Sequence, residues 1–500
     1  MHETQRIPDG LARPDVFTDA FRKKPVALLL GYVGAGFRGN TVNHELPRGS
    51  TVDDVLEDAI FAAGGIKLSN YRSRALSRLK WSRSSRTDKG VSSLATVVSL
   101  RMEVDPAAWD EDVEGAAIVQ SINAHLPPDV RVFGAYSTPK SFQARRVCVQ
   151  RTYDYLLPAR VLGLAGAEWP GTDAAAGRSD EQILETFREA LRAFVGSHYF
   201  HNYTRRSYYS PSNEKAEWTK RGRKNRRRDE SAAVDDDDDL ETADDDDDVV
   251  GVVEDATDAT DERAGYVGAE YVGSRQNGCY WLLERDEDDL VGIKHNRKVN
   301  AFDAGDVETT PDGEPFVRVT VRGDSFMLYQ IRKMIATACA ATLGHFPLGM
   351  IPASLARPAR VATPLAPAST LYLRGAEFMP FARPGSGAKE TEPDPNAPPR
   401  MERLDPSERV RADVARFQRE TLDPSMAPAL ASEEWDAFVA NMFKLRGWRR
   451  GAEGREHIDA VREVEEAYAA YAANREEMRA RRAAEEEAAK EEEAAKTEVA

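Results

Sequence analysis

Cysteine is scarce in this chain. Cys148, Cys279 and Cys339 are the three cysteines among 500 residues, and they lie far apart without a C-x-x-C spacing. Such thiols make neither the disulfide framework of a small secreted protein nor a zinc site built on cysteine pairs. We therefore expect the protein to work in a reducing compartment.

Long apolar runs are also missing. No stretch approaches the roughly 20 apolar residues that a membrane-spanning helix needs. The N-terminus carries Glu3, Asp9 and Asp15 and has no hydrophobic stretch before Val26. We expect a soluble protein with no signal peptide and no membrane partner.

Positive charge is in deficit, with a formal net charge of -16. A nucleic-acid partner needs a local surplus of Lys and Arg, so this balance at first argues against one. However, residues 229–263 hold eighteen acidic residues and one arginine, which leaves a net charge of +1 on the rest of the chain. That remainder can still carry a basic groove. The acidic block and the basic run 220–228 lack apolar periodicity, which predicts a disordered insertion.

The remaining sequence alternates between strand-like and helix-like segments. Short apolar or alternating runs predict strands, and amphipathic runs with capping residues predict helices. The predicted strands are 26–30, 94–100, 130–136, 152–157 and 317–321. The predicted helices are 52–63, 179–194 and 325–343, the last one ended by Gly344. This alternation indicates an α/β or α+β sheet domain with appended segments.

One polar loop stands out between Trp81 and the strand at 94–100. In it, Asp88 lies between the cations Arg86 and Lys89. A carboxylate in this setting is expected to stay ionised and open to a ligand. The plain alternative is an ordinary turn, because Asp and Gly are residues that turns prefer.

Several segments together favour the functional interpretation of this loop. In chain order they resemble the TruA-type tRNA pseudouridine synthase family, and especially its eukaryotic tRNA pseudouridine synthase 1-like branch. The segments that carry the resemblance are 31–39 (GYVGAGFRG), 84–91 (SSRTDKGV), 123–127 (NAHLP), 141–145 (SFQAR), 151–155 (RTYDY), 196–204 (GSHYFHNYT), 325–335 (SFMLYQIRKMI) and 371–373 (LYL).

The resemblance implies a catalytic role for three residues. Asp88 is expected to be the nucleophile, and Arg332 is expected to form an ion pair that keeps it ionised and aimed. Tyr153 is expected to stack on the flipped uracil and to take part in proton transfer at C5. Attack by Asp88 at C6 of the base and attack at C1′ of the ribose both remain open.

The resemblance also implies an RNA partner. The expected substrate is tRNA, modified in or near the anticodon arm, and other structured RNAs stay open as substrates. The expected RNA-binding residues are Arg86, Lys89, Arg145 and Arg151. Oligomeric state is not predicted by the sequence.

Neither a metal nor an organic cofactor is expected. His198, His201 and His295 have no cysteine or carboxylate partners at zinc-ligand spacing, so packing or RNA contact is the expected role for them. Two positions depart from the family pattern. Ser92 and Tyr329 stand where relatives often carry histidine, which bears on substrate preference and rate more than on reaction class.

The implied architecture consists of two related halves that form one continuous mixed or antiparallel sheet flanked by helices. An RNA-binding cleft is expected between the halves. The expected boundaries are an N-terminal extension (1–23), a first half with the Asp88 loop (24–136), a second half (137–378) interrupted by an insertion (206–290), a linker (379–403), a helical extension (404–450) and a charged tail (451–500). The tail is expected to be helical or disordered and to have almost no apolar stripe.

Two further questions stay open at this level. The basic run 220–228 is typical of a nuclear-import signal, which favours a nuclear location and leaves mitochondrial, plastid and cytoplasmic locations open. The alternative to an enzyme is a non-catalytic RNA-binding or scaffold protein that retains the fold.

The acidic block yields a first testable prediction. Deleting residues 229–263 is expected to leave folding and turnover measurable, because this block cannot build a core and its like charges repel phosphate. Circular dichroism, thermal melting and an activity assay check this. Loss of the folded state on deletion would show that the block is structural.

Overall fold

The computed structural model describes residues 21–73, 76–105, 109, 114–165, 177–205, 270–274, 278–283, 291–382, 401–444 and 455–498. The N-terminal twenty residues, the basic run, the acidic block and most of the predicted linker lie outside these ranges.

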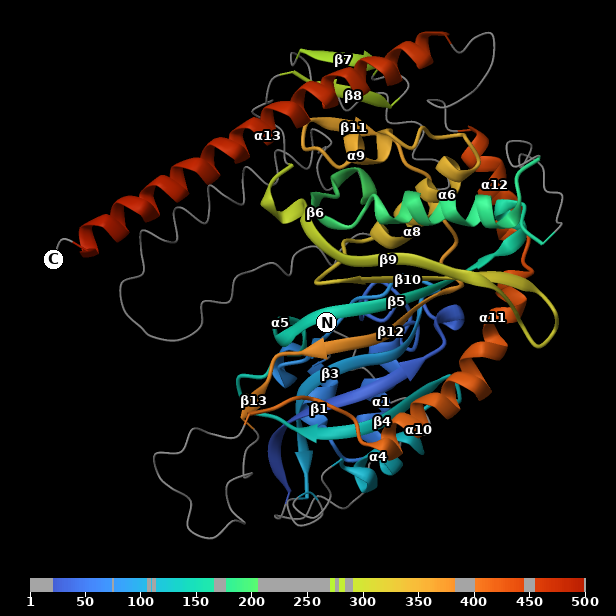
Figure 1. Ribbon diagram of the computed structural model, residues 1–500. Helices are drawn as coiled ribbons and strands as arrows, with labels where there is room; N and C mark the ends of the chain where they lie inside the picture. The colour runs from blue at the N-terminus through green and yellow to red at the C-terminus, as the bar shows by residue number, and fades with distance from the viewer. Residues whose placement is uncertain are drawn as a thin grey trace, which may run out of the picture.

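A mixed β-sheet forms the centre of the described structure (Figure 1). Eight of its strands follow the order β4–β1–β3–β12–β5–β10–β9–β6, and a ninth, β2, pairs with β3. The strands are β1 (Arg22–Tyr32), β2 (Ser82–Arg83), β3 (Ser92–Val104), β4 (Val130–Ser137), β5 (Cys148–Pro158), β6 (Gly196–Tyr199), β9 (Asn296–Thr309), β10 (Pro315–Gly323) and β12 (Leu371–Phe378). The predicted fold class, helices flanking one continuous sheet, is confirmed.

The two parts of this sheet meet where β3 pairs with β12. This is the parallel pairing of the sheet, with Tyr372 opposite Ser92 and Leu373 opposite Ser93, whereas its other described pairings are antiparallel. Strands from residues 22–137 lie on one side of the junction, and β5, β10, β9 and β6 lie on the other. The loop that carries Asp88 leads directly into β3, so it lies at this junction.

Helices and short helical turns connect and cover the strands. The helices are α1 (Val52–Ala62), α2 (Leu68–Ser73), α4 (Ala116–Asn123), α5 (Ala144–Val147), α6 (Asp180–Arg192), α8 (Gln330–Thr342) and α9 (Met350–Ser354). The 3-10 turns are η1 (Gly34–Gly36), η2 (Leu76–Leu79), η3 (Ala159–Leu162), η5 (His201–Tyr203) and η8 (Ile293–His295).

Local signals place the first of these helices well. Thr51 accepts a hydrogen bond from the backbone N–H of Asp54, and the Asp54 side chain accepts from Thr51, so a capping box starts α1 where the sequence predicts it. Its apolar face and α4 pack on the first part of the sheet, around Leu56 and Ile60. Apolar side chains of α6 and α8 form a second core with β5, β9 and β10.

Helix α8 begins later than predicted. The sequence pattern predicts a start near Ser325, but the helix starts at Gln330. Tyr329 has a left-handed backbone with φ of 66°, which interrupts any helix upstream of it. The side chain of Gln330 accepts a hydrogen bond from the N–H of Met327 at 2.9 Å, which links the first residue of the helix to the loop before it. Gly344 ends the helix region with φ of 71°, as predicted.

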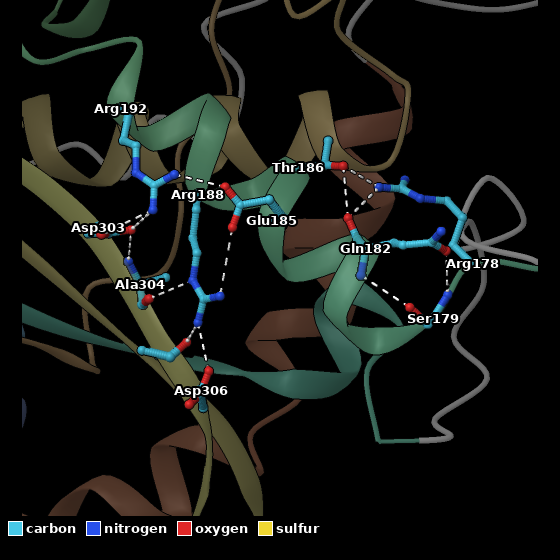
Figure 2. A network of polar contacts seen from close by, with 11 residues as sticks. Arg178, Ser179, Gln182, Glu185, Thr186, Arg188, Arg192, Asp303, Ala304 and Asp306 are labelled. Carbon is cyan, nitrogen blue, oxygen red and sulfur yellow. Dashed lines mark hydrogen bonds and ion pairs between the residues drawn. The ribbon is translucent and has the colours of Figure 1, made fainter.

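A polar network fixes α6 over β9 (Figure 2). Arg188 donates to the carbonyl of Ala304 at 2.9 Å and pairs with Asp306 at 2.8 Å. Arg192 pairs with Asp303 at 3.3 Å. Pairs this exposed contribute little stability each, so their main effect is to set the position of the helix on the strand.

The C-terminal extension packs along the other face of the sheet. It consists of α10 (Glu408–Phe417), a π-helix (η9, Gln418–Leu422), α11 (Asp423–Leu430) and α12 (Glu434–Lys444). Apolar side chains of the first three elements meet Leu29, Phe133 and Leu156, which come from both parts of the sheet. Helix α12 instead joins the core that contains α8. A two-stranded pair, β13 (Phe381–Ala382) with β14 (Met401–Glu402), precedes the extension.

The start of the charged tail packs against the fold, whereas the sequence predicts a tail with almost no apolar stripe that stays solvated or binds another partner. Helix α13 (Arg455–Glu498) passes over β7 (Tyr271–Ser274) and β8 (Cys279–Leu282), which form a small sheet with β11 (Ala359–Val361) (Figure 1). Val461 and Val464 are buried, and the ring of Tyr471 lies 5.4 Å from that of Trp281. With Tyr468, these residues recur every three or four positions, which is a stripe limited to the first turns of the helix.

No helix among the described residues combines the length and apolar character that a bilayer crossing requires.

The docked part of α13 yields a second prediction. Val464→Ala is expected to lower the free energy of unfolding by about 2 kcal/mol, because a fully buried valine loses two methyl groups and leaves a cavity. Met478→Ala, at an exposed position of the same helix, is the matched control and is expected to change it by less than about 0.5 kcal/mol. Urea unfolding measures both. Equal effects would mean that α13 does not dock through this stripe.

Candidate active site

The loop that carries Asp88 is anchored at both ends. Ser84 donates its N–H to the carbonyl of Val97 at 2.8 Å, and its hydroxyl accepts from the N–H of Val97 at 3.0 Å. At the other end, Val91 donates its N–H to the carbonyl of Asp88 at 3.1 Å, which closes a turn over Gly90. The loop is therefore fixed to β3 at its start and closed by a turn at its end.

Asn40 clamps the middle of this loop. Its side-chain oxygen accepts from the N–H of Thr87 at 3.1 Å, and its amide nitrogen donates to the carbonyl of Ser85 at 2.9 Å. The Tyr32 hydroxyl shares a hydrogen bond of 2.8 Å with the Thr87 hydroxyl. Asn40 is buried. Sequence reasoning missed this residue, and its position directly after the 31–39 segment is the signal that could have found it.

Glycines let that segment approach the loop. A Cβ on Gly34 would lie 2.2 Å from the carbonyl oxygen of Val91, so only glycine fits there. The N–H of Gly34 donates to the hydroxyl of Ser92 at 2.9 Å. Ser92, one of the departures from the family pattern, thus joins the end of the Asp88 loop to the 31–39 segment.

Arg332 reaches Asp88 from the first turn of α8. A guanidinium nitrogen of Arg332 lies 3.7 Å from a carboxylate oxygen of Asp88, and both side chains are largely buried, at 13% and 17% exposed. The Arg332 Nε donates to the carbonyl of Ala366 at 2.7 Å, in the β11–β12 loop (residues 362–370). Its guanidinium also lies 5.3 Å from the ring centre of Tyr329, the second departure. Two residues from opposite sides of the sheet junction therefore meet, as the family resemblance implies.

The environment of Asp88 changes its acidity. Burial raises the pKa of Asp88 above its ordinary value, while the charge of Arg332 and a hydrogen bond from the Tyr329 backbone oppose that rise. The sequence predicts a ligand-exposed carboxylate, and the structure shows one that is mostly desolvated. Such a group, poorly hydrated but aimed by a cation, suits a nucleophile.

Tyr153 lies beside the loop on β5. Its hydroxyl is hydrogen-bonded to the hydroxyl of Ser85, and its ring meets the edge of Phe326 at 5.5 Å. Burial raises the pKa of Tyr153 above its ordinary value, so the hydroxyl stays protonated near neutral pH. This state favours stacking and hydrogen bonding over a standing phenolate base.

Arg151 has a different position from the one expected for an RNA contact. Its guanidinium is buried and donates twice to the carbonyl of Ser84, at 2.9 and 2.6 Å, and once to that of Cys148 at 3.1 Å. It also donates to the carbonyl of Asp324. A guanidinium engaged by four such bonds holds the start of the Asp88 loop, so we assign it positioning in place of phosphate contact.

The other predicted RNA-binding residues lie nearer to solvent. Arg86 is exposed on the Asp88 loop, and Lys89 is partly exposed two residues after Thr87. Arg145 is exposed on α5, and its backbone N–H donates to the hydroxyl of Ser82 on β2 at 3.2 Å. These cations flank the loop, and their contact with RNA stays a prediction.

The 196–204 segment packs against the residues that precede α8. His201 is buried against the carbonyl of Ala359 at 2.6 Å, and burial lowers its pKa well below the ordinary value, so the ring is neutral. The Thr204 hydroxyl donates to the carbonyl of Leu328 at 3.0 Å, just before α8. Within the described ranges, no group of three or more His, Cys, Asp or Glu side chains is placed to hold a metal ion.

The Asn40 clamp yields a third prediction. Asn40→Ala leaves the buried N–H of Thr87 and carbonyl of Ser85 without these partners, so the free energy of unfolding is expected to fall by about 2 kcal/mol. Asn43→Ala removes one bond to Glu45 in an exposed turn and is expected to cost less than about 1 kcal/mol. Denaturant unfolding and amide exchange at Thr87 report the difference, and similar losses in both variants would contradict the clamp.

Comparison with known proteins adds an independent line. A family model for tRNA pseudouridine synthase matches residues 282–379. The chain is 28% identical over 398 residues to tRNA pseudouridine synthase 1 of Yarrowia lipolytica, covering 74% of this chain and 66% of that protein. It is also 28% identical over 335 residues to tRNA pseudouridine synthase 1 of Eremothecium gossypii, covering 63% and 56%. The pseudouridylate synthase 1 homolog of Mus musculus is 31% identical over 182 residues, covering 36% and 40%.

These matches therefore span somewhat more than half of the length of the two fungal relatives. The family model contains Arg332 and the whole β11–β12 loop, and it ends before the C-terminal extension. Model, relatives and the arrangement around Asp88 agree, and over the matched residues the chain is similar to the tRNA pseudouridine synthase family.

Proposed function

We propose that this chain isomerises uridines in tRNA to pseudouridine. The observation that carries the proposal is the ion pair between Asp88 and Arg332, held beside Tyr153 at the junction of the sheet. Relatives named as tRNA pseudouridine synthases support tRNA as the substrate class.

The reaction breaks the N1–C1′ bond of uridine, rotates the base and forms a C5–C1′ bond. The C5 proton is then lost and N1 gains a proton, so the product is an isomer of uridine. A carboxylate must reach the base or the sugar, and Asp88 is the group aimed by a cation for that step. The uridine has to leave its stack to reach a side chain that is largely buried. Tyr153 offers a ring for stacking and a protonated hydroxyl, so its part is to hold the base rather than to abstract a proton as phenolate.

The finer parts of the proposal come from the resemblance. In this proposal the modified uridines lie in or near the anticodon arm, and other structured RNAs stay open as substrates. Exposed Arg86 and Arg145 on elements next to the site support a backbone contact with RNA. The basic run 220–228 supports a nuclear location, although it lies outside the described residues.

The rival is a scaffold that binds RNA without chemistry. Such a protein has no need for a buried carboxylate paired with a buried arginine, because leaving charges in a desolvated site is costly. The assembled pair is therefore the feature that favours an enzyme.

The fourth prediction tests the central assignment. Asp88→Asn keeps the size of the side chain but removes its charge and nucleophilicity, so conversion of unmodified tRNA is expected to fall at least about 10³-fold. Binding of tRNA is expected to persist, because the negative charge of Asp88 repels phosphate and its removal takes away no attraction. Chemical mapping of pseudouridine after incubation with purified protein measures the reaction and names the sites.

A surface carboxylate serves as the control for this test. Asp303→Asn removes the negative charge of an exposed residue on β9 that pairs with Arg192. This variant is expected to keep a rate within about twofold of that of the parent. Conversion by the Asp88→Asn protein at a rate near that of the parent, free of host synthase, would refute the assignment. Tight RNA binding by the parent with no pseudouridine formed would favour the scaffold.

A further inference from the structure

The β11–β12 loop contacts Arg332 and lies close to Gly90 of the Asp88 loop. The carbonyl of Ala366 accepts from the Nε of Arg332 at 2.7 Å, and the N–H of Ala366 donates to the Arg332 carbonyl at 3.4 Å. On the other side, the Cβ of Ala368 lies 3.7 Å from the place that a Cβ on Gly90 would occupy. Any movement of this loop therefore moves the cation relative to the Asp88 loop.

Tyr155 fixes the loop from β5. Residues 362–367 belong to no helix or strand, so side chains must supply much of their support. The Tyr155 hydroxyl donates to the carbonyl of Pro367 at 3.0 Å, and the side chain is 1% exposed. One residue further, Leu156 donates its N–H to the carbonyl of Thr370 at 3.1 Å.

Helix α12 supports Tyr155 and the loop from outside. Trp435 is fully buried, its ring meets that of Tyr155 edge-on with centres 6.1 Å apart, and its indole N–H donates to the carbonyl of Ala429 at 2.9 Å. The neighbouring Glu434 accepts a hydrogen bond from the hydroxyl of Ser369 in the loop. One turn of α12 thus contacts both the loop and the residue that holds it.

We propose that Trp435 is a positioning residue: through Tyr155 and the β11–β12 loop, the C-terminal extension sets the placement of Arg332 against Asp88. The inference rests on the proposed function for its kinetic consequence. It assigns a role in the site to a helix that lies beyond the region matched by the family model.

The expected defect is in the rate of conversion rather than in RNA affinity. Trp435 and Tyr155 are buried and cannot contact tRNA, whereas a displacement of about 1 Å at reacting groups can cost up to about 100-fold in rate. The pH profile gives a second signature. Since Arg332 opposes the rise of the Asp88 pKa, a displaced Arg332 lets that pKa rise further. Activity that needs the ionised carboxylate is then lost at a higher pH on the acid side.

Three variants test the inference by graded changes. Tyr155→Phe keeps the ring but deletes the bond to Pro367, and it is expected to lower kcat on the order of threefold to tenfold with KM for tRNA unchanged. Trp435→Ala is expected to lower kcat on the order of tenfold to 100-fold. Trp435→Phe retains a ring edge against Tyr155 and is expected to restore most of the rate.

Phe417→Leu is the matched control. Phe417 is also a buried aromatic residue of the extension, but it packs against Phe133 at 5.6 Å in the cluster on the other face of the sheet. The substitution is expected to lower the melting temperature while leaving kcat and the pH profile unchanged. In an Arg332→Ala background, Trp435→Ala is expected to cost less than about a further twofold, because the group that it positions is gone.

A measurement that does not use activity separates this inference from the proposed function. Selective carbon-13 labelling of Asp side chains, with Asp88→Asn for assignment, follows the pKa of Asp88 by NMR, and this pKa is expected to be higher in Tyr155→Phe and Trp435→Ala than in the parent. An Asp88 pKa that is higher in these two variants than in the parent, together with a parent that makes no pseudouridine, would uphold the positioning role and refute the proposed function.

The opposite result overturns the inference. An active parent, together with folded Tyr155→Phe and Trp435→Ala proteins whose kcat, pH profile and Asp88 pKa all equal those of the parent, would show that α12 supports the fold alone. If Trp435→Ala fails to fold, a Tyr155→Phe protein that equals the parent in all three measurements overturns the inference by itself.

Discussion

The desolvated ion pair between Asp88 and Arg332 is the constraint that the rest of this structure serves. Removing two charges from water is costly unless their geometry and remaining hydrogen bonds are well satisfied. Neither residue can achieve this alone, since one lies on a loop and the other in the first turn of a helix. The surroundings therefore fix both partners, Asn40 from the first part of the chain and the β11–β12 loop from the second.

Features that depend on short stretches of chain were predictable from the sequence. The capping box at Thr51, the strand at 130–136 and the stop at Gly344 each follow from a few neighbouring residues. The loop position of Asp88 follows from the polar stretch around it. Pairing of Asp88 with Arg332 was a different matter, because only the family resemblance joined residues 244 positions apart.

Features that depend on tertiary contacts were missed. Asn40 looks like an ordinary loop residue until it bonds a backbone 45 and 47 positions away. Arg151 was expected to bind phosphate, because no local pattern reveals that its guanidinium makes four hydrogen bonds to three backbone carbonyls. The docking of α13 has the same origin, since the apolar residues of the small sheet complete a weak local signal.

Strand β5 shows how the sheet itself enters the chemistry. Arg151, Tyr153 and Tyr155 alternate along it, and successive residues of a strand point to opposite faces, so these three share one face. They hold, in order, the carbonyl of Ser84, the hydroxyl of Ser85 and the carbonyl of Pro367.

The intervening residue of β5 works on the opposite face. Asp154 accepts hydrogen bonds from Thr320 at 2.8 Å and Tyr372 at 3.1 Å, and so ties β5 to its neighbours β10 and β12. A shift of one residue in the pairing of β5 would exchange the two faces. The buried contacts of Asp154 thereby help to set the register in which Arg151, Tyr153 and Tyr155 face the Asp88 loop and the β11–β12 loop. The placement of the ion pair therefore depends on the pairing of the central strands.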